Sequence, residues 1–212
     1  MNAIHEDDAT DEAPGWAAID AALERTYGAV EPFGHIGTQV PYALGGPDPL
    51  DGISVYARDT PEPHWLLVGY GMSELYAKES ADAEVSGYGF EFTIRVVRRD
   101  GDDPPMWAAV MLQQLARYVV AQRPFAPGHT IHVASGTFGT ADTELAALAF
   151  LVDPDLGAIA TPFGSLTFLQ IAGLTEDEYA AAQGGNAPGV LSRIAARSTP
   201  LHLVDPARTT LG

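Results

Sequence analysis

The chain contains no cysteine, only one lysine and no long apolar run. Without cysteine it can form neither disulfide bonds nor thiolate metal sites. The lysine, Lys78, is followed by Glu79, so the phosphate-binding loop that requires Lys before Ser or Thr is missing. No segment approaches the ~20 apolar residues that span a bilayer, and the acidic residues 1–15 do not resemble a signal peptide. We therefore expect a cytoplasmic protein.

Basic residues are scarce as well. The 28 acidic side chains against 11 basic ones give a formal net charge of −17. A field of this sign repels nucleic-acid phosphates and anionic membranes, so we expect neither as a partner. It attracts basic proteins, such as a cationic peptide or a basic toxin. The simpler interpretation, which we favour from composition alone, is that the acidity serves only solubility.

Periodicity and composition predict where the regular elements lie. The acidic residues 1–15 predict a disordered tail, and an apolar stripe at spacings of three and four predicts a helix over 16–27. Glycine and proline dominate residues 33–51, which predicts a loop. Residues 90–97 alternate as in a strand, and the face that carries Phe90 is expected to be buried. Further strands are expected at 53–56, 64–70, 130–133, 145–151 and 166–172.

Three more helices are expected in the second half of the chain. Residues 107–122 carry a broad apolar stripe. Thr175 followed by Glu178 forms a capping box that begins the next helix, and a last helix is expected over 188–197. Helices and strands alternate without a regular βαβ repeat, which favours an α+β fold with a mixed, mainly antiparallel sheet flanked by helices. No linker separates two cores, so residues 16–212 are predicted to form a single domain.

Motifs that carry chemistry are largely missing. The segment Gly87-Tyr88-Gly89 precedes a strand instead of joining a strand to a helix, so it predicts a bulge or close packing and not a dinucleotide site. No Gly-x-Ser-x-Gly nucleophile elbow occurs. His129 and His132 lie three residues apart on a predicted strand and would point to opposite faces, so a shared metal ion is not expected.

Three carboxylates are the best candidates for catalysis. Glu91 lies among aromatic residues in a strand, and Asp48 and Asp51 lie in the Gly/Pro loop. A carboxyl with a raised pKa suits general acid catalysis, whereas Asp near Gly and Pro more often hydrogen-bonds its own turn. We favour the structural role, with a carboxylate-based enzyme as the alternative. We therefore predict a binding protein with no catalytic residue, no cofactor and no metal.

A series of phrases rich in Gly, Pro and aromatic residues runs in order through the chain. The phrases are LGGPDPLDGISVY at 44–56, HW at 64–65, YGMSELY at 70–76, SGYGFEFT at 86–93, PPMW at 104–107, LARYV at 115–119, TPFG at 161–164 and FLQIAG at 168–173. Over about residues 16–208 the series resembles the N-terminal domain of the Suppressor of fused family, in the form of a bacterial single-domain member.

The resemblance implies a mixed α/β domain without catalytic activity. The family's two-domain members in animals hold Gli-type transcription factors by clamping an extended peptide, with β-strand addition between the domains. One-domain relatives in bacteria are proposed immunity proteins that neutralise polymorphic toxins. This chain has room for only the first domain, so the two-domain clamp is not expected.

Tyr118 is the one residue that the resemblance carries over as a partner-binding candidate. It stands in LARYV and matches a tyrosine that lines the animal peptide site. The acidic residue that contacts the peptide's histidine would lie just before His129, where this chain has Gly128. That charge-assisted contact is therefore lost. Tyr118 also suits a core position on the predicted helix.

Two kinds of protein partner follow from these observations. The first expectation is a non-enzymatic protein-binding domain that acts as an immunity protein against a basic toxin. The alternative is a regulatory or scaffold module that binds an extended peptide segment. A folded toxin needs an interface of roughly 800 Å² on each partner, whereas a peptide needs a groove and an edge strand.

Overall fold

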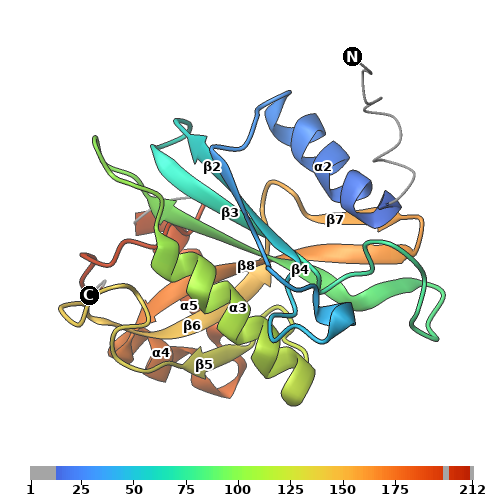
Figure 1. Ribbon diagram of the computed structural model, residues 1–212. Coiled ribbons are helices and arrows are strands. Elements are labelled where there is room, and N and C mark those ends of the chain that lie inside the picture. The colour runs from blue at the N-terminus through green and yellow to red at the C-terminus, as the bar shows by residue number, and fades with distance from the viewer. Residues whose placement is uncertain (1–12, 198–200, 211–212) are drawn as a thin grey trace.

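Eight strands form one open sheet in this computed structural model, which describes residues 13–197 and 201–210 (Figure 1). The strand order is β1-β2-β3-β4-β8-β6-β5, and β7 pairs with β8 outside this path. Only the β4–β8 pair is parallel among the described strands. The strands are β1 (Gly34–Gly37), β2 (Gly52–Arg58), β3 (His64–Tyr70), β4 (Val85–Val97), β5 (Thr130–His132), β6 (Leu145–Val152), β7 (Ala158–Thr161) and β8 (Gly164–Thr175). The helices are α2 (Pro14–Tyr27), α3 (Met106–Ala121), α4 (Glu176–Ala182) and α5 (Ala187–Arg197), with short 3-10 turns η1 (Tyr42–Leu44) and η2 (Gln183–Gly185).

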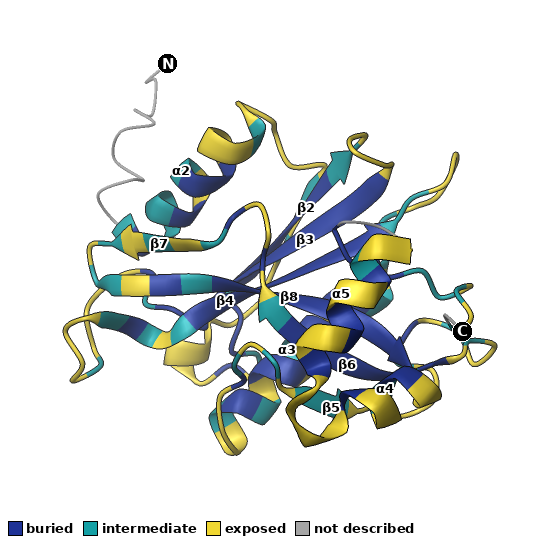
Figure 2. Ribbon diagram, turned by 180° about the vertical axis from the view of Figure 1, so that it is seen from behind, coloured by how far each residue is buried: buried dark blue, intermediate teal, exposed yellow. Residues whose placement is uncertain are grey.

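Helices cover both faces of the sheet. On one face α3 packs on the largest apolar cluster, which includes Phe92 and Phe150. On the other face α2 packs on β2 and β3 through residues such as Ile19 and Leu66, while α4 and α5 cover β6 and β8. The two opposite views show α3 in front of the sheet in Figure 1 and α4 and α5 in front in Figure 2. The predicted α+β fold with a mixed, mainly antiparallel sheet is confirmed.

Strand β4 runs through the middle of the sheet and is buried on both faces over residues 90–96 (Figure 2). The predicted apolar face, which carries Phe90, packs under α3. The second face carries Glu91, Thr93 and Arg95, and each of these residues is 0% exposed. This polar stripe lies between the apolar cluster under α2 and the one under α4 and α5. Buried polar groups require partners inside the protein. The alternation of residues along the strand does not by itself predict that its polar face is buried as well.

Two short strands, β1 and β7, were not predicted, whereas the strand expected at 130–133 is confirmed as β5. Residues 33–51, expected to form a loop, contain β1 and the turn η1. β1 has only four residues, two of them glycine, and its apolar content shows no period. β7 forms a hairpin with β8 in which Thr161 pairs with Gly164, so the turn predicted at 161–164 is confirmed. Both missed strands are too short for a periodic signal and form because a neighbouring strand offers backbone partners.

The predicted helices and the glycine bulge agree with the structure. α2 begins at Pro14 and so includes the last two residues of the predicted tail, while residues 1–12 of that tail lie outside the described residues. The capping box of Thr175 and Glu178 begins α4. Gly87 and Gly89 have positive φ and lie within β4, where the pairing with β8 shifts register. A Cβ on Gly87 would lie 2.7 Å from the Met72 carbonyl oxygen, so this glycine permits both a bulge and a close approach.

Candidate functional site

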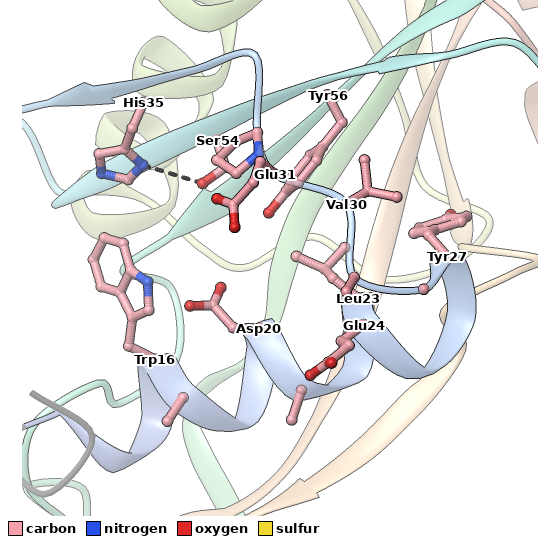
Figure 3. Close-up of a pocket in the computed structure, with 15 residues that line it drawn as sticks. Trp16, Asp20, Leu23, Glu24, Tyr27, Val30, Glu31, His35, Ser54 and Tyr56 are labelled. Carbon is pink, nitrogen blue, oxygen red and sulfur yellow. Dashed lines mark hydrogen bonds between the residues drawn. The ribbon is translucent and has the colours of Figure 1, made fainter. Parts of the chain in front are cut away.

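A cleft of about 750 Å³ lies between helix α2 and strands β1 and β2 (Figure 3). Trp16 and Asp20 line it from α2, and Glu31 lines it from the segment that connects α2 to β1. His35 of β1 and Tyr56 of β2 complete the opposite wall. Its lining thus combines aromatic rings with carboxylates, which suits recognition of a ligand with polar and apolar parts.

Contacts at the start of α2 fix this wall. The Gly15 amide donates a hydrogen bond to the Leu75 carbonyl oxygen at 2.9 Å, and a Cβ on Gly15 would lie 2.0 Å from the Glu74 carbonyl oxygen. The Trp16 ring stacks on Tyr70 with 4.2 Å between centroids and 14° between planes. The Tyr70 hydroxyl donates to Asp20 Oδ1 at 2.8 Å. The helix is therefore held by backbone, aromatic and polar contacts together.

The cleft is acidic. Asp20, Glu24 and Glu31 line it, and no described lining residue is a lysine or an arginine. In Figure 3 the carboxylates of Asp20 and Glu31 and the hydroxyl of Tyr56 point toward the same space. Burial raises the pKa of Asp20 although the Tyr70 hydrogen bond opposes this. Burial also raises the pKa of Tyr56, and the charges of Asp20 and Glu31 raise it further. Burial lowers the pKa of His35 in the opposite wall, while the Asp20 charge opposes that shift, so the negative field in this space comes from the carboxylates and not from burial.

His35 and Ser54 make the one contact in the cleft that resembles a nucleophile and its base. The distance between His35 Nδ1 and Ser54 Oγ is 3.1 Å. Ser54 is only 4% exposed, and β2 pairs on both sides, with His35 and with Val68, so its backbone amides belong to the sheet. An oxyanion hole needs free donors beside the nucleophile. Ser54 is therefore the hydrogen-bond partner of His35 in the cleft wall.

Tyr118 lies away from this cleft. It is half-buried on α3 and packs against the apolar cluster on the opposite face of the sheet. Its ring stacks on Phe125 with 5.3 Å between centroids, and Phe125 stacks on Phe150 at 4.1 Å. The structure thus places Tyr118 in an aromatic stack and does not bring it together with the cleft residues.

Glu91 has a structural environment. It is 0% exposed and accepts hydrogen bonds from the backbone amides of Gly71, Met72 and Ser73 and from the Ser73 hydroxyl, at 2.7–3.2 Å. Burial raises its pKa to about 7 although these donors favour the charged form. The carboxylate thus organises the segment between β3 and β4.

The other sequence candidates are dispersed. Asp48 pairs with Arg117 of α3 and does not bond its own turn, and Asp51 lies beside Tyr76, whose pKa is raised by burial and by the Asp51 charge. His132 Nε2 lies 3.0 Å from Glu176, while His129 Nδ1 accepts a hydrogen bond from the Ala126 amide. In the described part of the chain no group of three or more His, Asp or Glu residues is arranged to hold a metal ion.

Sequence reasoning missed the cleft because its residues come from three separate elements. No motif spacing joins Trp16 to His35 and Tyr56. The one local signal is the spacing of Trp16 and Asp20, which are neighbours on one face of a helix. That signal is shared by many helices and points to no ligand by itself.

The chain matches known proteins along most of its length. The sequence model of the Suppressor of fused protein family matches residues 46–209. The human protein called Suppressor of fused homolog is 35% identical over 175 residues, which cover 76% of this chain and 35% of the human protein. A chain in a crystal structure described as the Sufu–Fu complex has a TM-score of 0.85 and 29% identity, with 93% of this chain and 91% of that chain covered. The crystal structure of Drosophila Suppressor of Fused also gives a TM-score of 0.85, at 30% identity, covering 94% of this chain and 51% of that one.

This protein belongs to the Suppressor of fused family. The chain spans about a third of the length of the human and mouse relatives that it matches. No helix in residues 13–197 and 201–210 is both long and apolar enough to cross a membrane.

Proposed function

We propose that this chain is a non-enzymatic protein-binding domain. The observation that carries the proposal is its similarity, over 93% of its length, to a chain crystallised in the Sufu–Fu complex. At a TM-score of 0.85 the two share the arrangement of sheet and helices that positions any binding surface. A protein partner is therefore the class of ligand that we assign to this chain.

The arrangement of its polar groups supports binding over catalysis. Glu91 accepts four hydrogen bonds from one segment of the chain, and Asp153 pairs with the buried Arg95. A catalytic acid or base must reach a substrate proton, whereas these carboxylates are occupied inside the fold. Ser54 lacks the neighbouring free amides that acyl transfer needs.

The finer proposal is that the partner is a basic protein, as for an immunity protein that neutralises a bacterial toxin. The net charge of −17 supports it, because complementary charge accelerates the encounter of two proteins. Such binding weakens as salt screens the charges. A toxin-like gene beside the gene for this chain would support this role independently.

A sheet edge favours a second candidate, the binding of an extended peptide. β5 is the last strand of the sheet and pairs only with β6 among the described strands. An exposed edge strand offers backbone groups to which a peptide can add as a further strand. Tyr118, at the C-terminal end of α3, is the candidate partner contact on the face of the sheet that α3 covers.

The test is capture of partners from the native lysate on the immobilised chain at low and moderate salt, followed by mass spectrometry. We expect one stoichiometric basic protein whose recovery falls as salt increases. A bait of the same chain unfolded by heat controls for adhesion to an acidic surface. Recovery of a folded basic toxin supports immunity, recovery of a regulator through a short segment supports the peptide module, and no specific capture contradicts the proposed function.

A further inference from the structure

The described lining of the α2 cleft has His35 as its one basic side chain, and burial lowers the pKa of His35 although the Asp20 charge opposes this. No ion pair joins Glu24 or Glu31 to another residue in the described part of the chain. Two arginines adjoin the cleft at Tyr27, since Arg58 lies over the Tyr27 ring at 4.4 Å and Arg95, which pairs with Asp153, donates to the Tyr27 hydroxyl. Like charges that converge on one cavity repel one another unless a cation joins them. The cleft is therefore electrostatically complementary to a positive group.

The walls add a second kind of recognition. The Trp16 ring, held by its stack on Tyr70, and the Tyr56 hydroxyl both border the space that Asp20 and Glu31 face (Figure 3). Aromatic rings attract cations through their π faces. A planar guanidinium donates several hydrogen bonds in fixed directions and stacks on rings, whereas an ammonium group acts as a compact charge. The combination of two carboxylates, a hydroxyl and an indole favours arginine over lysine.

The size and rim of the cleft indicate a chain segment as its occupant. A volume of about 750 Å³ exceeds what one side chain fills. At the rim lie two exposed apolar residues of the lining, Val30 at 40% exposure and Pro32. Beside them β1 is the first strand of the sheet and pairs only with β2 among the described strands. A polypeptide could thus contact the rim while it places one side chain inside.

We propose that the cleft between α2 and strands β1 and β2 receives an arginine side chain of a protein partner, with its guanidinium between Asp20 and Glu31. This inference rests on the proposed protein-binding function and assigns to it a site and a recognised group. The guanidinium donates to the two carboxylates, and the Tyr56 hydroxyl orients it. The site lies on the face of the sheet opposite to Tyr118 and is independent of the β5 edge.

The direct test titrates the full chain with a blocked Ala-Arg-Ala peptide and with the same peptide carrying citrulline, which has the shape of arginine without its charge. Binding is followed by amide chemical shifts in NMR spectra and by the Trp16 indole signal. We expect the arginine peptide to bind at least about tenfold more tightly, as charge-assisted hydrogen bonds imply. Equal binding of the two peptides overturns the proposal. Free argininamide that binds as tightly as the arginine peptide also overturns it, because such a result assigns the cleft to a small cation and not to a protein partner.

Charge-neutral variants locate the binding. The Glu31 carboxylate has no partner in the described fold, and Glu31→Gln should weaken binding of the arginine peptide about tenfold. Asp20→Asn should weaken binding by a similar factor while it keeps an acceptor for the Tyr70 hydroxyl. The control is Glu62→Gln, which removes the same charge from an exposed residue outside the cleft. Equal weakening by Glu62→Gln would mean that only net charge matters and would overturn the site.

The captured partner separates this inference from the proposed function. If the wild-type chain captures a partner and Glu31→Gln captures it equally well, the cleft is not the site although protein binding stands. If the wild-type chain captures nothing, the proposed function fails whatever the peptides show. Loss of capture by Glu31→Gln with retention by Glu62→Gln supports both.

Discussion

The guanidinium of Arg95 and the carboxylate of Asp153 form a two-point ion pair in which both side chains are 0% exposed. Nη1 lies 2.7 Å from Oδ2 and Nη2 lies 3.0 Å from Oδ1. Burial alone would raise the pKa of Asp153, but Arg95 and the Thr93 hydroxyl hold it below its usual value. Arg95 also donates to Tyr27 at the end of α2, so the pair connects the central strand to the helix that lines the cleft.

Removing one partner of this pair should destabilise the whole domain. Asp153→Asn leaves the buried Arg95 charge without its main partner, and we expect a loss of about 3–5 kcal/mol in the free energy of unfolding. Urea unfolding measures it. The control is Asp59→Asn, which breaks the pair with Arg98 at a carboxylate that is 83% exposed and should cost less than about 1 kcal/mol. Similar losses in both variants would contradict the structural role of the buried pair.

Glu91 should make stability depend on pH. Its pKa is about 7 in the folded chain because of burial, against an ordinary value of 4.5. The folded state therefore binds the proton of the Glu91 carboxyl more tightly than the unfolded state does. The resulting contribution to the free energy of unfolding is fully present below pH 4.5 and is lost as the pH rises through 7. The loss is on the order of 3 kcal/mol.

Glu91→Gln, which cannot ionise, isolates this effect. The free energy of unfolding of the wild-type chain relative to Glu91→Gln should fall from pH 4.5 to above pH 7. Urea titrations across this range measure the difference, with Glu79→Gln as a control that removes one carboxylate from an exposed position. A constant difference for Glu91→Gln would show that burial does not hold the proton.

The sequence predicted most reliably those elements whose own residues carry a strong pattern. The strand at 64–70 has the predicted bounds, and the Thr175–Glu178 capping box begins α4. Such patterns depend on local geometry and need no knowledge of neighbours. The ordered phrases rich in Gly, Pro and aromatic residues gave the family resemblance separately, and the family match confirms it.

Features that depend on distant residues were not predictable. The alternation in β4 identified its apolar face but not the burial of Arg95, which requires α2 and Asp153 to cover the second face. The cleft requires Asp20, Glu31 and Tyr56 to meet across three segments. Tertiary packing decides both, and no spacing along the chain encodes it.

Gly71 should tolerate no side chain. Its φ is +140°, and a Cβ would lie 2.4 Å from the Pro49 carbonyl oxygen. Gly71→Ala should therefore cost about 3 kcal/mol or more, because the 47–52 loop must shift to relieve the clash. Gly101→Ala is the matched control, since φ is +83° there and nothing lies within 4 Å of the added Cβ; it should cost about 1 kcal/mol. Thermal or urea unfolding compares the two, and equal costs would locate the effect in backbone conformation alone.

Tyr118→Phe separates a partner contact from a core role. The substitution keeps the ring stack on Phe125, so the free energy of unfolding should change by less than about 0.5 kcal/mol. If the hydroxyl contacts a partner at the β5 side of the sheet, affinity for the captured protein should fall about threefold to tenfold. Tyr88→Phe, on β4, removes a hydroxyl from an exposed tyrosine on a strand that does not pair with β5, and it should leave affinity unchanged. Unchanged affinity in both variants would assign Tyr118 to the aromatic stack alone and leave the α2 cleft as the candidate contact surface.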